Sequence, residues 1–355
     1  MIVKNKGYSP QGKPRTLKEL EDSHQTAPRG RSIQPFVSTS LARHENSEVF
    51  ATPLACRNKK ILVTGANGFI GSHLTQKLVA LGAEVTAMTK GGAQSLQVVK
   101  DKIKIIQHDL NSTHKSADLK FDAIFHLAAL TDLRTCSENP LLAYNTNVLG
   151  TLKLIEQYKS VGTFILISTL GVYGEPLYLP IDENHPALPI EPYAASKAAA
   201  ESVVIGVCSS RKIRYAIARL FNVYGPGQRD DFVIPRIINQ ALTTNDVVLK
   251  NRKSTRDFIY IDDVIDALIK IYTTDADGIY NVGSGKETSI GELASIIQKH
   301  ISKKIDVTFV EEVGSARVQR SLADIKKIKR NVGWNPSTDL SSGITKMLNY
   351  YNDIQ

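Results

Sequence analysis

The sequence predicts an α/β fold in which a doubly wound parallel sheet is followed by a smaller carboxyl-terminal lobe. Two observations carry this prediction. From residue 59 onwards, short apolar runs alternate with segments of helical periodicity, a pattern typical of parallel strands joined by right-handed helical crossovers. The length of 355 residues, 42% of them hydrophobic, is sufficient for one main domain with a companion lobe.

The first predicted element is a strand at 60–64, which is followed at once by glycines and by a helix whose apolar residues recur from Ile70 to Leu81. Gly82 is expected to end that helix at the C′ position. The sequence predicts further strands at 84–88, 103–107, 121–127, 164–168 and 215–220, and helices at about 145–159 and 193–209.

The first 58 residues differ in composition from the rest of the chain. They mix glycine and proline with polar residues, and only 17–23 could form a short helix, so we expect a disordered or loosely docked extension. This segment holds nine Lys and Arg against five Asp and Glu, and so contributes +4 to the net charge of +9. The charge alone leaves nucleic acid, a membrane surface and an anionic small molecule open as partners.

Membrane insertion, secretion and metal binding find no support in the sequence. No run of about 18 apolar residues occurs. The amino terminus lacks the apolar core of a secretory signal, so a cytoplasmic location is expected by default. Cys56, Cys136 and Cys208 lie far apart and the histidines have no metal-ligand spacing, so neither a disulfide framework nor a metal site is predicted.

A glycine-rich turn lies directly between the first predicted strand and the first predicted helix. Gly65, Gly68 and Gly71 form a GxxGxxG spacing that includes Phe69 and Ile70. Glycine lets the backbone turn tightly and approach a pyrophosphate, while the helix amino terminus offers free N–H groups and a partial positive charge. The turn therefore predicts a dinucleotide site in a Rossmann-type domain.

A second motif, Tyr193-Ala-Ala-Ser-Lys197, follows Pro192, a residue that suits the first turn of a helix. The spacing of four places the phenol and the ammonium on the same face of that helix. We expect the cation to lower the pKa of Tyr193 from about 10, so that the phenol serves as an acid or base near neutral pH.

With these two motifs the chain resembles the extended short-chain dehydrogenase/reductase family, the NAD-dependent epimerase/dehydratase group, over about residues 59–350. Further segments match the family in order: Asp109-Leu110, His126-Leu-Ala-Ala129, 145–151, 168–174, 219–226, Arg256-Asp-Phe258 and Gly333-Trp-Asn-Pro336. The resemblance implies a Rossmann domain at 59–225, which also receives strands from about 255–285, and a substrate-binding lobe formed mainly by 226–355.

The motifs and the resemblance together assign the candidate site residues. The catalytic set is Tyr193, Lys197 and Thr169. The dinucleotide contacts are Gly65, Gly68, Phe69, Ile70, Gly71, Thr89, Lys90, Asp109, Leu110, Leu127, Ala128, Ala129, Asn147, Tyr193 and Lys197. The substrate contacts are Thr169, Asn222, Arg256 and Arg317. Arg219 is expected to be structural, and His126 to be a packing residue at a strand end.

The implied function is that of an NAD(P)-dependent nucleotide-sugar epimerase, resembling the 4-epimerases. Tyr193 would take the proton from a sugar hydroxyl while the nicotinamide receives the hydride, Thr169 would hydrogen-bond the same oxygen, and Lys197 would hold the ribose and the Tyr193 charge. The expected partner is a nucleotide sugar, without nucleic acid or membrane. The resemblance also implies a homodimer paired through the helices from about Asn145 and Tyr193.

Three departures from the family pattern bear on this function. Leu170 and Gly171 stand where dehydratases and decarboxylating members carry an acid beside the catalytic threonine, which counts against both reactions. The second strand is followed by Lys90 and lacks the acid that selects NAD, so NAD and NADP are both open. The usual Arg-x-Gly-acid segment is missing, so either Arg317 or Arg320 holds the substrate diphosphate or the substrate is an unusual one.

Two alternatives to the epimerase stay open. One is an NADPH-dependent nucleotide-sugar 4-ketoreductase, which the missing second-strand acid favours. The other is a catalytically silent nucleotide-binding protein, which would have no need of an activated phenol. The adjacent Asp262 and Asp263 are interpreted as a helix N-cap rather than as metal ligands.

Overall fold

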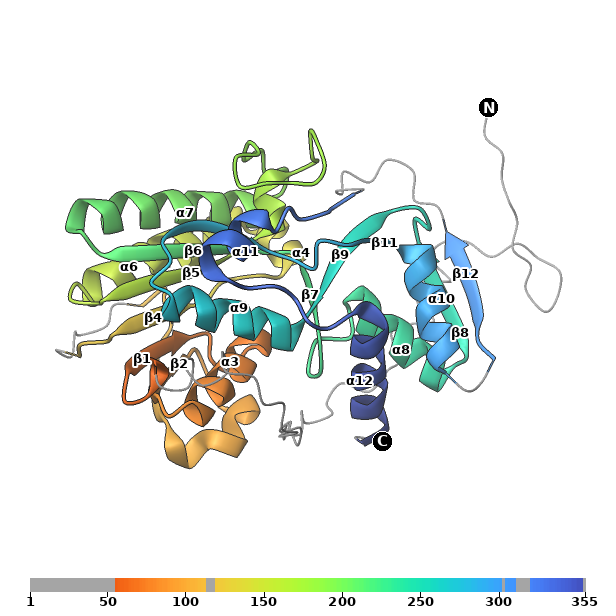
Figure 1. Ribbon diagram of the computed structural model, residues 1–355, viewed down its shortest axis with the longest axis horizontal. Helices are drawn as coiled ribbons and strands as arrows, with labels where there is room; N and C mark the ends of the chain where they lie inside the picture. Colours follow the sequence, from red (N-terminus) through yellow and green to blue (C-terminus); the bar gives the residue numbers. More distant parts are fainter. Residues whose placement is uncertain (1–54, 113–118, 302–303, 311–319, 354–355) are drawn as a thin grey trace. The chain divides into compact units, whose positions relative to one another are not determined.

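The computed structural model describes residues 55–112, 119–301, 304–310 and 320–353 (Figure 1). This part of the chain forms one large parallel sheet, two small sheets and the helices around them. The predicted extension up to residue 54, with its helix at 17–23, and the candidate substrate residue Arg317 lie outside the described residues.

The large sheet has seven strands in the order β10-β6-β5-β4-β1-β2-β3, and all neighbouring strands are parallel. The chain starts in the middle of the sheet and winds outwards in both directions, so that the order reverses between β1 and β4. This confirms the predicted doubly wound α/β fold. The strands span Lys60–Thr64 (β1), Glu84–Thr89 (β2), Lys104–Gln107 (β3), Ala123–His126 (β4), Thr163–Thr169 (β5), Arg214–Leu220 (β6) and Gly278–Val282 (β10).

Strand β5 shows how the sheet is buried on both faces. Ile165 and Ile167 belong to an apolar cluster shared with α3 and α9, whereas the intervening Phe164 and Leu166 belong to one shared with α6 and α7. Helices α3 and α9 therefore cover one face of the sheet, and α6 and α7 cover the other (Figure 1). These helices span Phe69–Ala80 (α3), Ile261–Thr273 (α9), Gly150–Gln157 (α6) and Pro192–Arg211 (α7).

The predicted strands and helices of the first half are found within a few residues of their expected bounds, with one exception. The predicted helix at 145–159 is preceded by α5 (Pro140–Tyr144) and begins as the π-helical turn η2 (Asn145–Leu149), before α6 continues it. The chain turns helical early because the Asn139 side chain accepts a hydrogen bond from the Leu142 N–H, 3.0 Å away, and Pro140 occupies the first helical position. As expected, Gly82 ends α3 with a positive φ of 79°.

The second half of the chain supplies the small sheets. Strand β9 (Thr255–Tyr260) lies between β7 (Asn222–Tyr224) and β11 (Glu287–Ser289), while β8 (Asp246–Lys250) pairs with β12 (Asp306–Val310). Strand β10 then returns to the large sheet beside β6. The remaining described helices are η1 (Gln94–Lys102), α4 (Leu133–Glu138), η3 (Leu170–Tyr173), α8 (Val233–Thr243), α10 (Ile290–His300), α11 (Lys326–Val332) and α12 (Leu340–Asp353).

The N-cap interpretation of the adjacent aspartates is wrong. Tyr260 is the N-cap of α9, and both aspartates lie in the first helical turn. The buried Asp263 carboxylate instead accepts hydrogen bonds from the Ser337 N–H, the Ser337 hydroxyl and the Thr338 N–H at 3.0, 2.8 and 3.0 Å. It thereby fastens the segment that follows the buried Trp334 to α9.

Candidate active site

The glycine turn has the geometry that a bound pyrophosphate requires. Gly65 has a φ of 66°, and a Cβ added to it would lie 2.8 Å from the Ala128 nitrogen. A Cβ on Gly71 would lie 2.2 Å from the Gly65 oxygen, so only glycine permits this contact between turn and helix. Helix α3 starts after Gly68 without a side-chain cap, which leaves its amino-terminal N–H groups directed at an incoming anion.

A cavity of about 200 Å³ opens beside this turn, at the carboxyl ends of β1, β2, β3 and β4. Half of its lining was predicted from the sequence: Gly65, Lys90, Asp109, Leu110, Ala128 and Ala129. The structure adds Met88, His108, Asn111, Leu130, Leu142 and Thr146. The first four adjoin predicted residues, and Thr146 on η2 adjoins the predicted Asn147, so their chain positions would have suggested them. Leu142 comes from α5 and carries no sequence signal.

Lys90 and Asp109, both predicted dinucleotide contacts, are paired in this cavity. The Lys90 Nζ lies 3.1 Å from the Asp109 Oδ2. A hydrogen bond from the Asn111 N–H, and secondarily the Lys90 ammonium, hold the pKa of Asp109 below its usual value. Thr89, the neighbouring prediction, is buried at the end of β2.

The predicted catalytic residues meet where β5 ends and α7 begins. Thr169 is the last residue of β5, and Tyr193 lies in the first turn of α7, which Pro192 starts at the N1 position. The Thr169 side chain lies close enough to the Tyr193 phenol to lower the pKa of that phenol. The Thr169 hydroxyl accepts the Gly171 N–H at 3.1 Å, which fixes its direction.

The expected lowering of the Tyr193 pKa is wrong for these side chains by themselves. Burial, with a smaller effect of Cys136, raises the pKa of Tyr193 to about 12, and the Thr169 side chain opposes this only in part. Lys197 does not act on the phenol strongly enough to reverse it. Instead, burial lowers the pKa of Lys197 itself to about 8, although the Glu201 carboxylate opposes the change.

A buried ion pair lies directly beneath Lys197. The Arg219 guanidinium binds the Glu201 carboxylate with its Nη2 2.7 Å from Oε2, and the Ser168 hydroxyl donates to the same carboxylate. The Arg219 guanidinium also stacks over the Tyr173 ring at 4.7 Å. Arg219 thus has the structural position that the sequence led us to expect.

Asn147, predicted to support the site, is buried in the π-helical turn η2. Its amide oxygen accepts the Leu130 N–H at 2.7 Å, and its amide nitrogen donates to the Leu130 carbonyl at 3.0 Å and to the Ser196 hydroxyl at 2.9 Å. It therefore connects the segment after β4 to the catalytic helix, a geometry common for π-turns at functional sites.

Two of the predicted substrate residues, Asn222 and Arg256, lie on the small sheet of β7, β9 and β11, whereas Thr169 ends β5 in the large sheet. Asn222 on β7 pairs in register with Phe258 on β9, two residues after Arg256. The Asn222 amide nitrogen donates to the Asp257 carbonyl at 3.1 Å and to the Ser321 hydroxyl at 3.2 Å. These bonds hold strand β9 against the segment that follows Arg320.

Arg320, the other candidate for the diphosphate, already has a carboxylate partner. It forms a two-pronged ion pair with Glu287 on β11, at 2.8 and 2.7 Å. A diphosphate on Arg320 would therefore exchange places with Glu287.

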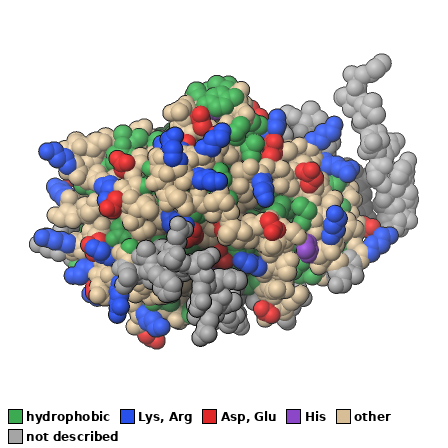
Figure 2. Space-filling view, in the orientation of Figure 1, with side chains coloured by type: hydrophobic (Ala, Val, Ile, Leu, Met, Phe, Trp, Pro, Cys, Tyr) green, Lys and Arg blue, Asp and Glu red, His purple; other side chains and the backbone are tan. Residues whose placement is uncertain are grey.

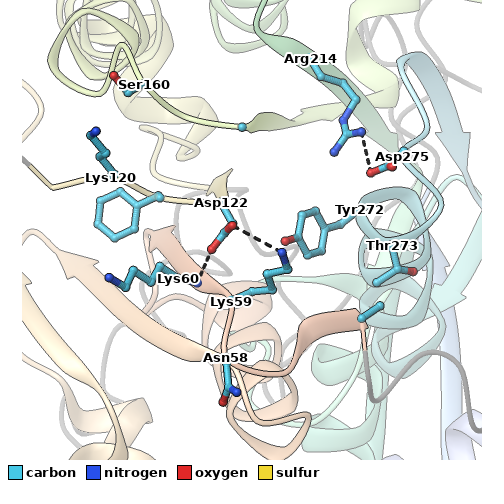
Figure 3. A pocket seen from close by; sticks show the side chains of 13 residues that line it. Asn58, Lys59, Lys60, Lys120, Asp122, Ser160, Arg214, Tyr272, Thr273 and Asp275 are labelled. Atoms are coloured by element: carbon cyan, nitrogen blue, oxygen red, sulfur yellow. Dashed lines mark hydrogen bonds and ion pairs between the residues drawn. The ribbon is translucent and has the colours of Figure 1, made fainter.

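A second cavity, of about 750 Å³, lies elsewhere (Figure 3). It is bordered by the amino-terminal ends of β1, β4, β5 and β6, whereas the glycine turn and Thr169 lie at the carboxyl ends. Its charged groups are largely satisfied by one another: Lys59 lies 3.6 Å from Asp122, and Arg214 lies 2.5 Å from Asp275. It does not contain any of the predicted site residues.

Fold and glycine turn together are those of a dinucleotide-dependent enzyme, and Tyr193, Lys197 and Thr169 are its predicted catalytic set. A family model described as GDP-mannose 4,6 dehydratase matches residues 62–347. The chain belongs to this family, within the extended short-chain dehydrogenases/reductases of the NAD-dependent epimerase/dehydratase type.

The curated relatives divide between two reactions. A protein of Methanocaldococcus jannaschii described as "putative UDP-glucose 4-epimerase" is 33% identical over 300 residues, 82% of this chain and 97% of the relative. UDP-glucuronic acid decarboxylase 1 of Xenopus tropicalis is 30% identical over 307 residues, 82% of this chain and 72% of the relative.

Solved structures agree with the fold over most of the chain. UDP-N-acetylglucosamine 4-epimerase from Methanobrevibacter ruminantium M1, in complex with UDP-N-acetylmuramic acid, has a TM-score of 0.79 at 31% identity and covers 84% of this chain and 100% of its own. RMD from Pseudomonas aeruginosa, complexed with NADPH, has a TM-score of 0.73 at 27% identity and covers 84% of this chain and 100% of its own. MoeE5 in complex with UDP-glucuronic acid and NAD has a TM-score of 0.75 at 28% identity and covers 83% of this chain and 100% of its own.

These findings agree with NAD or NADP as the predicted cofactor. They place the chain among nucleotide-sugar epimerases, decarboxylases and dehydratases. Within the described ranges, no helix combines the length and the apolar character needed to span a membrane.

Proposed function

We propose that this protein is an NAD(P)-dependent nucleotide-sugar epimerase that acts at C4 of the sugar. The observation that carries the proposal is the pairing of Tyr193 with Thr169 at a site whose following residues, Leu170 and Gly171, bear no acid. Epimerisation requires a base, a hydrogen-bond donor and a hydride carrier, and no acid to expel a hydroxyl or a carboxyl group.

The packing around Gly171 supports this choice. A Cβ at Gly171 would lie 3.2 Å from the Ala194 Cβ and 3.5 Å from the Thr169 hydroxyl oxygen, so a larger acidic side chain would have to displace the start of α7. Among the described residues, no carboxylate perturbs the pKa of Tyr193. The arrangement therefore favours redox-neutral epimerisation over elimination.

The residues present fit a nicotinamide dinucleotide, because the glycine turn forms a cradle that a single Cβ would fill. A dinucleotide held there would supply the hydride chemistry, as acceptor from the sugar carbon and as donor back to its other face. We assign the pyrophosphate to the turn at Gly65 and the start of α3, and the adenosine half to the cavity that contains Lys90 and Asp109.

The side chains of this protein transfer the proton of the sugar hydroxyl and orient the sugar and the ribose. Tyr193 removes the proton from the C4 hydroxyl of the sugar, and Thr169 hydrogen-bonds the same oxygen. Lys197, protonated below pH 8, would hold the ribose hydroxyls, and in that complex it would stabilise the phenolate that these side chains do not favour by themselves. We assign the substrate lobe mainly to 226–355, with Asn222, Arg256 and the candidate Arg317 toward the nucleotide diphosphate.

A second candidate, an NADPH-dependent 4-ketoreductase, is favoured by Lys90 at the end of β2 and by the missing acid there. A decarboxylase is represented among the relatives, but the same lack of an acid at 170–171 counts against it. We further propose that the protein is a homodimer paired through the helices that start at about Asn145, which comprise η2 and α6, and at about Tyr193, which is α7.

The test begins by denaturing the purified protein and identifying any released dinucleotide by mass spectrometry. In parallel, the native protein is incubated with a panel of UDP- and GDP-sugars that includes UDP-glucuronate. Stoichiometric NAD with redox-neutral conversion supports the epimerase. NADPH consumption with a keto sugar means a reductase, CO₂ release means a decarboxylase, and dinucleotide binding without any conversion means a silent binding protein.

A further inference from the structure

His126, the last residue of β4, is buried between two threonine hydroxyls. Its Nδ1 lies 2.8 Å from the Thr64 Oγ1, and its Nε2 lies 2.9 Å from the Thr151 Oγ1. Thr64 ends β1, beside the glycine turn, and Thr151 lies in α6, on the opposite face of the sheet from α3. His126 therefore bridges the central strand pair and a helix, which exceeds the packing role expected from the sequence.

The hydrogen-bond partners fix the direction of every proton around His126. The Thr151 hydroxyl donates its single hydrogen to the Asn147 carbonyl at 2.6 Å, so its oxygen must accept from the Nε2–H. On the other side, the Thr64 oxygen accepts the Ala128 N–H at 3.1 Å and its own hydrogen points at Nδ1. His126 is therefore the neutral Nε2–H tautomer, the one form that satisfies both neighbours.

The chain of hydrogen bonds begins at the dinucleotide cavity. Ala128 lines that cavity, and its N–H is the first donor. Asn147, whose carbonyl is the last acceptor, holds both backbone groups of Leu130, another lining residue, with its side chain. One connected set of hydrogen bonds therefore fixes both Ala128 and Leu130 in the segment that follows β4.

The same set reaches the catalytic helix. The Asn147 amide donates to the Ser196 hydroxyl at 2.9 Å, and that hydroxyl donates to the Tyr193 carbonyl at 2.7 Å. Ser196 is the residue between Tyr193 and Lys197 on α7 that points toward η2. A displacement of Asn147 would therefore move the phenol and the ammonium relative to the cavity wall.

We propose that His126 is a positioning residue that, as the neutral Nε2–H tautomer, sets the catalytic helix α7 at a fixed distance from the dinucleotide-lining segment after β4. The inference rests on the proposed function, because it assigns the positioned groups to hydride and proton transfer. The charge environment supports it: burial, and then the nearby Lys197 ammonium, lower the pKa of His126 to about 3. The imidazole therefore stays neutral over the working range of an enzyme.

The test uses an isosteric pair of variants at Thr151 in the full chain. Thr151→Val keeps the buried volume but removes the acceptor of the Nε2–H, whereas Thr151→Ser keeps the hydroxyl. We expect Thr151→Val to lower kcat by about 10- to 100-fold at saturating dinucleotide, with the substrate KM within about threefold, because small misplacements of reacting groups carry such costs. Thr151→Ser should restore kcat to within about threefold of the unmodified protein.

Equal kcat for Thr151→Val and the unmodified protein would overturn the proposal. Equal losses of kcat in Thr151→Val and Thr151→Ser would also overturn it, because the Thr151 hydroxyl would then have no positioning role. Should Thr151→Val fail to fold, Thr64→Val and Thr64→Ser provide the same comparison at the other ring nitrogen.

A measurement without turnover tests the hydrogen-bond chain separately. Nitrogen-15 NMR of histidine-labelled protein, with His126→Gln to assign the signal, should show a protonated Nε2 and an unprotonated Nδ1 at pH 7. A protonated Nδ1 or an imidazolium would overturn the chain of bonds. If no nucleotide sugar is converted by the unmodified protein, the proposed function fails while this spectrum still decides the tautomer.

Discussion

The ammonium of Lys90 lies 3.1 Å from the carboxylate of Asp109, so the cation that follows β2 is paired with the acid that follows the neighbouring strand β3. Their side chains are 77% and 35% exposed. A pair this accessible to water contributes at most about 1 kcal/mol, so Lys90 is readily released to a competing anion. If both residues contact the dinucleotide as proposed, we expect the choice between NAD and NADP to depend on both of them.

Asp109→Asn should shift the preference toward NADP. It frees the Lys90 ammonium for a 2′-phosphate, and we expect NADP to bind about three- to tenfold tighter relative to NAD. Lys90→Asp should have the opposite effect and weaken NADP more than NAD, because two carboxylates would then face the phosphate. Isothermal titration of both dinucleotides measures the ratio, and unchanged ratios in both variants would make Lys90 an ordinary surface lysine.

Tyr193→Phe should abolish turnover without loss of the dinucleotide. The phenol is the proposed proton acceptor, and loss of such a group lowers kcat by about 10²- to 10⁴-fold. Dinucleotide affinity should stay within about twofold, since the glycine turn and the cavity are untouched. Initial rates with the accepted nucleotide sugar and parallel dinucleotide titrations provide both numbers. Unchanged turnover would sink the proposed mechanism.

Lys197 should make the stability of the fold depend on pH between about 8 and 10.5. Burial lowers its pKa in the folded protein to about 8 from a value of 10.5, so in this window the unfolded chain binds more protons than the folded protein. The free energy of unfolding should therefore rise with pH. Relative to Lys197→Met, the gain should be roughly 3 kcal/mol, measured by urea unfolding at pH 7.5, 9 and 10.5. A difference that does not change with pH would contradict the buried ammonium.

Asp263→Ala should destabilise the protein strongly, and Asp262→Ala weakly. The buried Asp263 carboxylate accepts three hydrogen bonds, and leaving those donors unpaired costs about 2–4 kcal/mol. Asp262 is exposed and lies 3.7 Å from the Lys346 ammonium, which predicts a loss below about 1 kcal/mol. Both residues lie in the first turn of α9, so helix-dipole effects largely cancel in the comparison. Equal losses in urea unfolding would show that Asp263 is not a fastening point.

The proposed homodimer gives a further test. Two large apolar side chains beside α7 are unusually exposed: Leu141 on α5 is 70% exposed and Leu149 on η2 is 47% exposed. Leu141→Arg with Leu149→Arg should convert the dimer to a monomer in sedimentation equilibrium. Leu177→Arg, at an equally exposed position outside these helices, is the control and should leave the dimer intact. A monomeric unmodified protein would refute the dimer.

Much of the fold could be predicted because local pattern and global architecture agree. Buried parallel strands such as β5 read as continuous apolar runs. A short strand, a glycine with positive φ and a helix start follow one another within the ten residues 60–69. The predicted start of the helix at 145–159 was too late. The helical conformation begins at α5, where Asn139 is the N-cap and Pro140 the first helical residue, and both precede any apolar periodicity.

The site was predictable only as far as its residues belong to motifs. Tyr193 and Thr169 lie close together as expected, yet the pKa of Tyr193 is raised, because burial, which no spacing reveals, outweighs the lowering effect of the Thr169 side chain. Arg320 and Lys90 were assigned to phosphates, but each has a carboxylate partner from another strand. Such pairings are set by tertiary packing and leave no trace in the local sequence.

The seventh strand of the large sheet has a consequence for how such enzymes can be recombined. Because β10 comes from beyond β7, β8 and β9, an exchange of everything after residue 225 would also remove an edge strand from the dinucleotide sheet and expose the backbone of β6. The part of the chain that can be exchanged is therefore the segment between β6 and β10 together with the residues that follow β10. A chimera that respects this boundary keeps its nucleotide half whole while it acquires a new substrate.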